Sequence, residues 1–143
     1  MEKWRQDVID EARTWLRTPW HHNQSAKGAG VDCAQLIKAC YVNTQLVLPF
    51  QTGYYPVDWM LHREDDRFLS WLGKYADQVN DPQPGDAAVW RYGRAFSHGA
   101  IVTGWPKIIH AYRPERMVVE GDASRGPLAE RPVVFYQLRR MSA

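Results

Sequence analysis

The sequence lacks the features that mark membrane-spanning and signal-directed proteins. Its 143 residues contain no apolar run near the roughly 18 residues that a transmembrane helix needs, so we expect no membrane span. The first residues, MEKWRQDVIDEARTWL, mix acidic and basic side chains and do not resemble a secretory signal. We therefore expect synthesis in the cytoplasm without a signal peptide, and any export must follow another route.

Excess charge and cysteine are also lacking. The net charge is +2, and Arg139 and Arg140 are the only adjacent arginines, so no basic stripe indicates nucleic acid as a partner. Two cysteines, Cys33 and Cys40, do not form a disulfide framework. On one helix they would lie about 10 Å apart along the axis, beyond disulfide reach, which favours a reducing compartment or indifference to redox. Because internal repeats and low-complexity segments are missing too, we expect one domain over residues 1–143.

Aromatic residues, in contrast, are abundant. The chain has seven Trp and seven Tyr within a composition of 45% hydrophobic and 24% charged residues, which is typical of a globular protein. We expect most of these rings to pack in the core and at its rim, and a carbohydrate or peptide groove is the alternative.

Helical periodicity is found in the first half of the chain. The first helix carries an apolar stripe and ends at Thr18-Pro19; the stripe is Trp4, Val8, Ala12 and Trp15. After the polar loop WHHNQSAKGAG, Asp32 is the expected N-cap of a second helix, whose stripe is Cys33, Leu36, Ile37, Cys40, Tyr41 and Thr44. A third helical region is predicted from Pro56 to a stop at Gly73, with Leu61, Phe68, Leu69 and Leu72 as its apolar positions.

Short strand-like runs replace the helical pattern after the turn cluster DPQPGD. These runs are AAVWRY, HGAIVTG, KIIHAY, RMVVEG and PVVFYQL, and they are separated by Gly, Pro and charged residues. Helices followed by neighbouring strands predict an α+β fold in which an antiparallel sheet forms the second half.

Cys33 is the first candidate for chemistry. At the start of the second helix, it would lie near unpaired backbone N–H groups and the positive end of the helix dipole. Both features favour a thiolate, and the same N–H groups could hold an oxyanion that forms on a substrate carbonyl. A buried structural cysteine is the alternative interpretation, and Cys33 alone does not decide between them.

Two histidines of the strand region could serve such a nucleophile. His98 begins an apolar run, His110 lies in KIIHAY, and TGWPK between them is a good hairpin turn. If the hairpin centres on Gly104 or Trp105, His98 lies opposite His110 or Tyr112, and both histidines share one face. One ring could then orient the other, as the third group of a triad orients its base.

A metal site is the competing explanation for the histidines. In principle His21, His22, His98 and His110 could bind zinc together with Cys33. However, the sequence has no HExxH motif and no second cysteine at close spacing, so we expect no metal. His62, in the third helical region, is expected to be a surface or packing residue.

Taken together, four stretches resemble the NlpC/P60 family of papain-like cysteine peptidases, and in particular its single-domain phage-tail and prophage members. The stretches are RTPWHHNQSAKGAGVDCAQLI, QPGDAAVWR, SHGAIVTG and IIHAY, in the order of the family's TPY…GxDCSGL, LQPGDLVFF, HVGIYLG and IHA. VDWMLHREDDRFLSWL also resembles the helical insert of the phage-type members. The fold implied is papain-like, with N-terminal helices, one of which bears the nucleophile at its start, packed on a C-terminal antiparallel sheet.

The resemblance implies a role for each matching residue. Cys33 would be the nucleophile, His98 the general base and His110 the polar residue that orients the base. Trp20, His22 and Asp32 would line the substrate site and the oxyanion hole. Trp20 replaces the tyrosine that the family usually has after Thr-Pro, and His22 with Asn23 replaces its paired glycines, so the groove is expected to differ.

The activity implied is that of a cysteine endopeptidase or amidase that needs no cofactor. Its substrate would be a peptidoglycan stem peptide, typically cleaved between D-γ-glutamyl and the diamino acid. In the phage setting the protein would act at the cell wall or belong to the virion tail, with phage tail proteins as partners. Two alternatives stay open: a tail-assembly protein that uses the domain for interaction, and a thiol hydrolase or acyltransferase acting on another amide or acyl group.

Overall fold

The computed structural model describes residues 1–51 and 67–139. Its helices are α1 (Lys3–Arg13), α2 (Cys33–Asn43) and α3 (Arg67–Leu72), with 3-10 turns η2 (Arg113–Glu115) and η3 (Gly126–Glu130). Its strands are β1 (Ser25–Ala26), β2 (Gly30–Val31), β3 (Ala76–Val79), β4 (Ala87–Tyr92), β5 (Ala95–Gly104), β6 (Lys107–Tyr112), β7 (Met117–Asp122) and β8 (Val133–Leu138). No helix among the described residues is long and apolar enough to cross a membrane.

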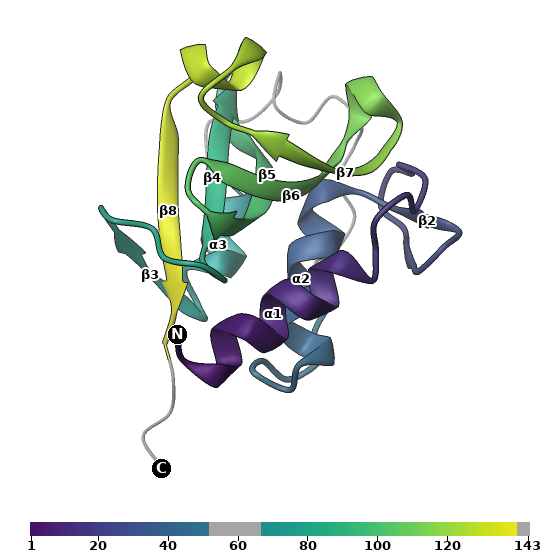
Figure 1. Ribbon diagram of the computed structural model, residues 1–143, viewed down its shortest axis with the longest axis vertical. Coiled ribbons are helices and arrows are strands. Elements are labelled where there is room, and N and C mark those ends of the chain that lie inside the picture. Colours follow the sequence, from purple (N-terminus) through teal and green to yellow (C-terminus); the bar gives the residue numbers. More distant parts are fainter. Residues whose placement is uncertain (52–66, 140–143) are drawn as a thin grey trace.

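The main sheet is antiparallel and has six strands in the order β3-β8-β4-β5-β6-β7. Strands β4 to β7 follow one another as hairpins, while β8 returns from the end of the chain to pair between β3 and β4 (Figure 1). A short separate ribbon joins β1 to β2. Helices followed by an antiparallel sheet confirm the predicted α+β class.

Helices α1 and α2 pack together beside the sheet, and α2 lies against β5 and β6 (Figure 1). The apolar stripe predicted for α1 is buried, and so are Leu36, Ile37, Cys40 and Tyr41 of the stripe predicted for α2. The approach of α2 to β5 is close at Gly99, where a Cβ would lie 2.6 Å from Cδ1 of Ile37. Only glycine therefore lets the helix pack against this strand at that depth.

The turn that leads into β4 is held by a buried ion pair. The guanidinium of Arg5, on α1, donates from Nη1 to Asp86 Oδ1 at 2.8 Å and to the Pro84 carbonyl at 2.9 Å. Asp86 also accepts the backbone N–H of Gln83 at 2.8 Å, and Gly85 between them has a φ of 93°. The QPGD sequence thus joins the first helix to the start of the sheet.

Element boundaries differ from the prediction in several places. Strands β4 and β6 have the predicted bounds, whereas β5 begins earlier, at Ala95, and β1, β2 and β3 were not predicted. Helix α1 ends at Arg13 rather than continuing to Thr18-Pro19. The cause is tertiary: Arg17 takes a φ of 72° and donates its N–H to Val118, which draws this segment onto β7.

The third helical region is described only at its end. Helix α3 covers Arg67–Leu72 and stops before Gly73, as predicted, and Phe68 and Leu72 are buried. The rest of the predicted region, including Leu61 and His62, lies outside the described residues.

Candidate active site

Cys33 is the first residue of α2, and Asp32 is its N-cap, as the sequence predicts. Asp32 Oδ1 accepts the backbone N–H of Gln35 at 2.9 Å, and Oδ2 accepts that of Asn23 at 2.6 Å. One buried carboxylate therefore caps the helix and also ties the preceding loop to it. Cys33 is partly exposed, whereas Cys40, farther along α2, is fully buried.

The Cys33 thiol lies against strand β5 at a β-bulge. Its Sγ donates to the carbonyl oxygen of Ser97 at 3.3 Å. Neighbouring residues of β4 pair with His98 and with Phe96, so Ser97 is the extra residue that no β4 residue opposes. Bulges bend a strand and re-aim its side chains, and this bulge places Cys33 beside the residue that precedes His98.

His98 and His110 are hydrogen-bonded to each other. His98 Nε2 and His110 Nδ1 are 2.8 Å apart, and the two ring centroids are 5.0 Å apart. Strands β5 and β6 pair Ile101 with Ile109, so the same register places Tyr112 opposite His98 and His110 diagonally across from it. The predicted shared face is thus confirmed, and of the two predicted partners Tyr112 is the one directly opposite.

Tyrosine rings enclose the histidine pair. Tyr112 stacks on His110 with centroids 4.5 Å apart and an angle of 18° between the rings. Tyr92, at the end of β4, meets His98 edge-on at 5.9 Å. The guanidinium of Arg131, which precedes β8, lies over the Tyr92 ring, 3.7 Å from its centroid. Both histidines are buried, so the pair is shielded from water on these sides.

Desolvation in this environment favours the neutral forms of Cys33, His98 and His110. Burial, and after it the Asp32 carboxylate, raises the pKa of the Cys33 thiol to about 12, although nearby backbone N–H groups lower it. Burial, then His110 and Arg131, lowers the pKa of His98 well below 6.5, and burial lowers that of His110 to about 4. The direction for Cys33 is opposite to what the helix N-terminus alone predicts, because desolvation outweighs the dipole and the N–H groups.

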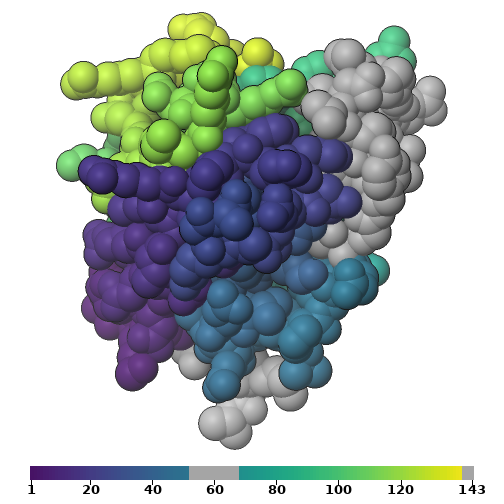
Figure 2. All heavy atoms as spheres, turned by 90° about the vertical axis from the view of Figure 1, so that its right-hand side faces the viewer, coloured from purple at the N-terminus to yellow at the C-terminus, as the bar shows by residue number. Residues whose placement is uncertain are grey.

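Trp20 and His22 lie on the loop between α1 and α2, which Figure 2 shows in dark blue below the green β6–β7 region. The backbone N–H of Trp20 donates to the Arg116 carbonyl at 2.8 Å, which fastens the loop to the start of β7. The Arg113 guanidinium lies over the Trp20 ring, and the rings of Trp20 and His22 are 6.5 Å apart. Both residues are partly exposed.

The structure also bears on the histidines considered as metal ligands. One ring nitrogen of His98 and one of His110 are hydrogen-bonded to each other, and His21 is exposed on its loop. Within residues 1–51 and 67–139, no three His, Cys, Asp or Glu side chains gather closely enough to hold a metal ion.

Sequence reasoning missed some residues of the site. Tyr92 and Arg131 gave no local signal, because their contact with the histidines depends on how β4 and β8 join the sheet. Ser97 gave none either, since a bulge is set by strand pairing. Tyr112 could be found, because it lies two residues after His110 and therefore on the same face.

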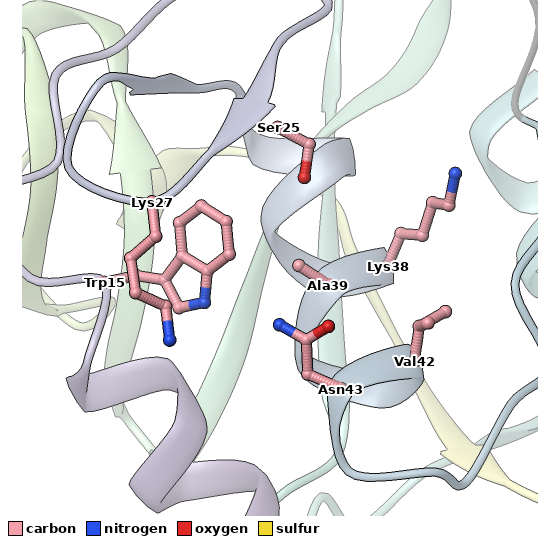
Figure 3. Close-up of a pocket in the computed structure, with 7 residues that line it drawn as sticks. All are labelled: Trp15, Ser25, Lys27, Lys38, Ala39, Val42 and Asn43. Carbon is pink, nitrogen blue, oxygen red and sulfur yellow. The ribbon is translucent and has the colours of Figure 1, made fainter.

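A hollow lies between α2 and the segment that follows α1, away from these residues (Figure 3). It measures about 290 Å³ and is lined by Trp15, Ser25, Lys27, Lys38, Ala39, Val42 and Asn43. Much of its polar lining is joined through Glu11, whose Oε2 accepts from Trp15 Nε1, Lys27 Nζ and Asn43 Nδ2 at 2.9–3.0 Å. These bonds join α1, the turn after β1 and α2, which gives the hollow a structural explanation.

Comparison with solved structures identifies the fold as that of NlpC/P60 domains. The NlpC/p60 domain of the peptidoglycan hydrolase SagA is similar with a TM-score of 0.60 and 19% identity, over 91% of this chain and 96% of that chain. NlpC1 from Trichomonas vaginalis is similar with a TM-score of 0.71 and 16% identity, over 99% of this chain but 49% of that chain. The sequence itself matches no family model and has no significant match among curated proteins.

Another solved structure shows that this fold does not require catalysis. RipD from Mycobacterium tuberculosis, described as a non-catalytic NlpC/p60 domain protein adapted to peptidoglycan binding, has a TM-score of 0.61 and 14% identity. The likeness covers 96% of this chain and 98% of RipD. Whether the present chain is an enzyme therefore depends on its own residues.

Proposed function

We propose that this chain is a cysteine peptidase that hydrolyses amide bonds in peptidoglycan stem peptides. One arrangement carries the proposal: the Cys33 thiol lies against the β5 backbone next to His98, whose ring is hydrogen-bonded to His110. Nucleophile, base and orienting group are the parts that covalent amide hydrolysis needs. The NlpC/P60 fold supports peptidoglycan as the substrate, since SagA and the similar RipB of M. tuberculosis are described as peptidoglycan hydrolases.

The first step is acylation of Cys33. Because His98 Nε2 is engaged by His110, Nδ1 is the nitrogen of His98 that is left to act as base. The thiol is neutral at rest, so His98 takes its proton as sulfur attacks the carbonyl carbon. Collapse of the tetrahedral intermediate breaks the C–N bond, and His98 gives the proton to the leaving amine, which leaves a thioacyl enzyme.

The second step is deacylation. His98, neutral again, removes a proton from water as the water oxygen attacks the thioester carbon. The C–S bond then breaks to release a carboxylic acid, and His98 gives its proton to the leaving sulfur, which restores the thiol. His110 holds the His98 ring in place and stabilises the imidazolium form of His98 through their 2.8 Å hydrogen bond. Tyr112, stacked on His110, keeps that ring in position.

The oxyanion and substrate contacts belong to the helix start and its loop. Backbone N–H groups at the start of α2 lie by the thiol and could hold the oxyanion. We assign Trp20 and His22, both partly exposed, to the wall of the substrate groove. Asp32 would act through position, because its two oxygens cap α2 and bind the loop backbone.

The finer assignments follow from the sequence resemblance. We propose the D-γ-glutamyl–diamino acid bond as the scissile bond and a phage or prophage tail as the setting, so that the chain would act at the cell wall with tail proteins as partners. Two alternatives compete with this proposal. The first is a tail-assembly role without catalysis, and the second is a thiol hydrolase or acyltransferase that acts on another amide or acyl substrate.

Mass analysis of muropeptides tests the proposal. Purified protein is incubated with peptidoglycan, beside Cys33→Ala and the matched control Cys40→Ala, which removes a buried thiol. We expect new peptide fragments with wild type and Cys40→Ala and none with Cys33→Ala. Absence of fragments from reduced, unmodified wild type would favour the tail-assembly role. Absence of fragments together with a covalent adduct of a broad electrophile at Cys33 would favour another acyl substrate.

A further inference from the structure

The second ring nitrogen of His110 points at a glycine. His110 Nδ1 is bonded to His98, and a Cβ built on Gly121 of β7 would lie 2.9 Å from His110 Nε2. Strands β6 and β7 pair Ile108 with Gly121 and His110 with Val119, so Gly121 is the diagonal neighbour of His110 on the same face. The backbone φ of Gly121 is not positive, so its conformation does not require glycine. The built Cβ would lie 3.5 Å from Ile108 Cγ1, an ordinary contact, so the close approach to the His110 ring is the contact that favours glycine here.

The His110 ring has little room to move away from β7. Tyr112 stacks on one of its faces, with centroids 4.5 Å apart, and the 2.8 Å bond to His98 fixes its other end. A methyl group on Gly121 would push Nε2, and the ring would tilt against Tyr112 or lengthen its bond to His98. The missing side chain at residue 121 is therefore coupled to the geometry of the histidine pair.

The proton positions that the proposed catalysis needs set the direction of this hydrogen bond. If His98 Nδ1 is to accept a proton from the thiol, neutral His98 must carry its own proton on Nε2. That Nε2–H donates to His110 Nδ1, which must then be bare, so neutral His110 carries its proton on Nε2. The competent tautomer of the pair thus requires a protonated nitrogen that faces Gly121.

The surroundings of Nε2 suit an N–H group. Within the described residues no side chain or carbonyl is bonded to it, and His110 lines a cavity of about 340 Å³ between β6, β7 and η3. The polar residues Glu115, Glu120, Asp122 and Arg125 also line this cavity, which makes it a place where water can accept the N–H hydrogen bond. A side chain at residue 121 would stand at the point where ring and cavity meet.

We propose that Gly121 is a positioning residue of the histidine pair: its missing side chain leaves room for a protonated Nε2 on His110 and so holds His110 as the acceptor of His98. The inference rests on the proposed function for its catalytic consequence. Its structural content, the position of two protons, can be measured without any turnover.

Histidine ring ¹⁵N NMR of the reduced wild-type protein at neutral pH provides that measurement. We expect His110 with Nε2 protonated and Nδ1 bare, and His98 also with Nε2 protonated. In Gly121→Ala the His110 signals should move toward mixed tautomers, while in Gly104→Ala they should not. Gly104 is the matched control because an added Cβ there meets no atom within 4 Å. A wild-type His110 protonated on Nδ1 would overturn the proposal, whatever the protein cleaves.

Peptide-cleavage kinetics give a second, separate test. We expect Gly121→Ala to lower kcat by about 10- to 100-fold, as small misplacements of catalytic groups do, and Gly104→Ala to stay within about twofold. His110→Asn places a side-chain oxygen where Nδ1 stood and has no atom corresponding to Nε2. In the His110→Asn background, Gly121→Ala should lower kcat by less than about twofold, because residues 110 and 121 then no longer interact. If Gly121→Ala lowered kcat by the same factor in the wild-type and His110→Asn proteins, the proposal would be overturned.

Discussion

His98 Nε2 and His110 Nδ1 are 2.8 Å apart across the β5–β6 hairpin, on diagonal rather than opposite positions. Tyr112 occupies the opposite position and meets both rings, with centroid distances of 5.4 Å to His98 and 4.5 Å to His110. The bond engages Nε2 of His98 and leaves Nδ1 as the other ring nitrogen. The predictions below follow from this arrangement and from the burial around it.

Loss of the His110 acceptor should lower the rate of chemistry. His110→Ala should reduce kcat by about 100-fold or more, since an oriented base contributes about 10²–10⁴-fold. His110→Asn should retain most of the activity, because its side-chain oxygen can accept from His98 Nε2. Steady-state cleavage of a stem peptide measures both variants. Wild-type kcat in His110→Ala would remove His110 from the mechanism.

Alkylation of Cys33 should depend on pH as expected for a neutral thiol with a raised pKa. Because burial and Asp32 raise its pKa to about 12, the iodoacetamide rate should still rise above pH 8.5, by about tenfold per pH unit. Peptide mass mapping separates Cys33 from Cys40, which should stay unmodified while the protein is folded because it is fully buried. A rate that is already constant between pH 6 and 8 would mean a resting thiolate paired with imidazolium.

Folding stability should decrease in mild acid. Burial lowers the pKa of His110 from 6.5 to about 4, so the unfolded chain binds more protons than the folded one between these values. The contribution of neutral His110 to the free energy of unfolding is therefore fully present above pH 6.5 and is lost as the pH falls toward 4. This loss lowers the free energy of unfolding by up to roughly 3 kcal/mol. Urea unfolding at pH 7 and pH 4.5 measures this. His110→Asn should show a smaller difference, and an identical difference would contradict the assignment.

The Arg5–Asp86 pair should be a strong stability determinant. Its side chains are 7% and 1% exposed, so Arg5→Ala leaves a buried carboxylate without its partner and should cost about 3–5 kcal/mol of unfolding free energy. The control is Lys3→Ala, which breaks an exposed pair with Asp7 on the same helix and should cost less than about 1 kcal/mol. Equal losses in urea unfolding for the two variants would show that the QPGD turn does not need Arg5.

Arg131 should tune the base. Its positive charge, after burial and His110, lowers the pKa of His98, so Arg131→Gln should move the acidic limb of the pH profile of kcat/KM to higher pH. The shift should shrink at high salt, because Arg131 is partly exposed and its charge is screened. Arg125→Gln, which removes an exposed cation at the other end of η3, is the control. A limb that stays in place in Arg131→Gln would contradict the electrostatic role.

Several features of the site could be predicted because they depend on residues close together in the chain. Asp32 before an apolar helical stripe predicted the N-cap and placed Cys33 at the helix start. Alternation along strands predicted a shared face for His98 and His110, since side-chain direction has a period of two residues. The α+β class followed from the same local patterns.

What the sequence alone could not determine depends on contacts between distant segments. The insertion of β8 between β3 and β4, the bulge at Ser97 and the diagonal histidine bond are set by strand pairing, which local patterns do not specify. Burial raises the pKa of Cys33 against the effect of its helix, because desolvation arises only when β5 covers the thiol. Residue types and their periodicity thus determined which groups are candidates for the site, and tertiary packing decided their register, their burial and the direction in which their pKa values move.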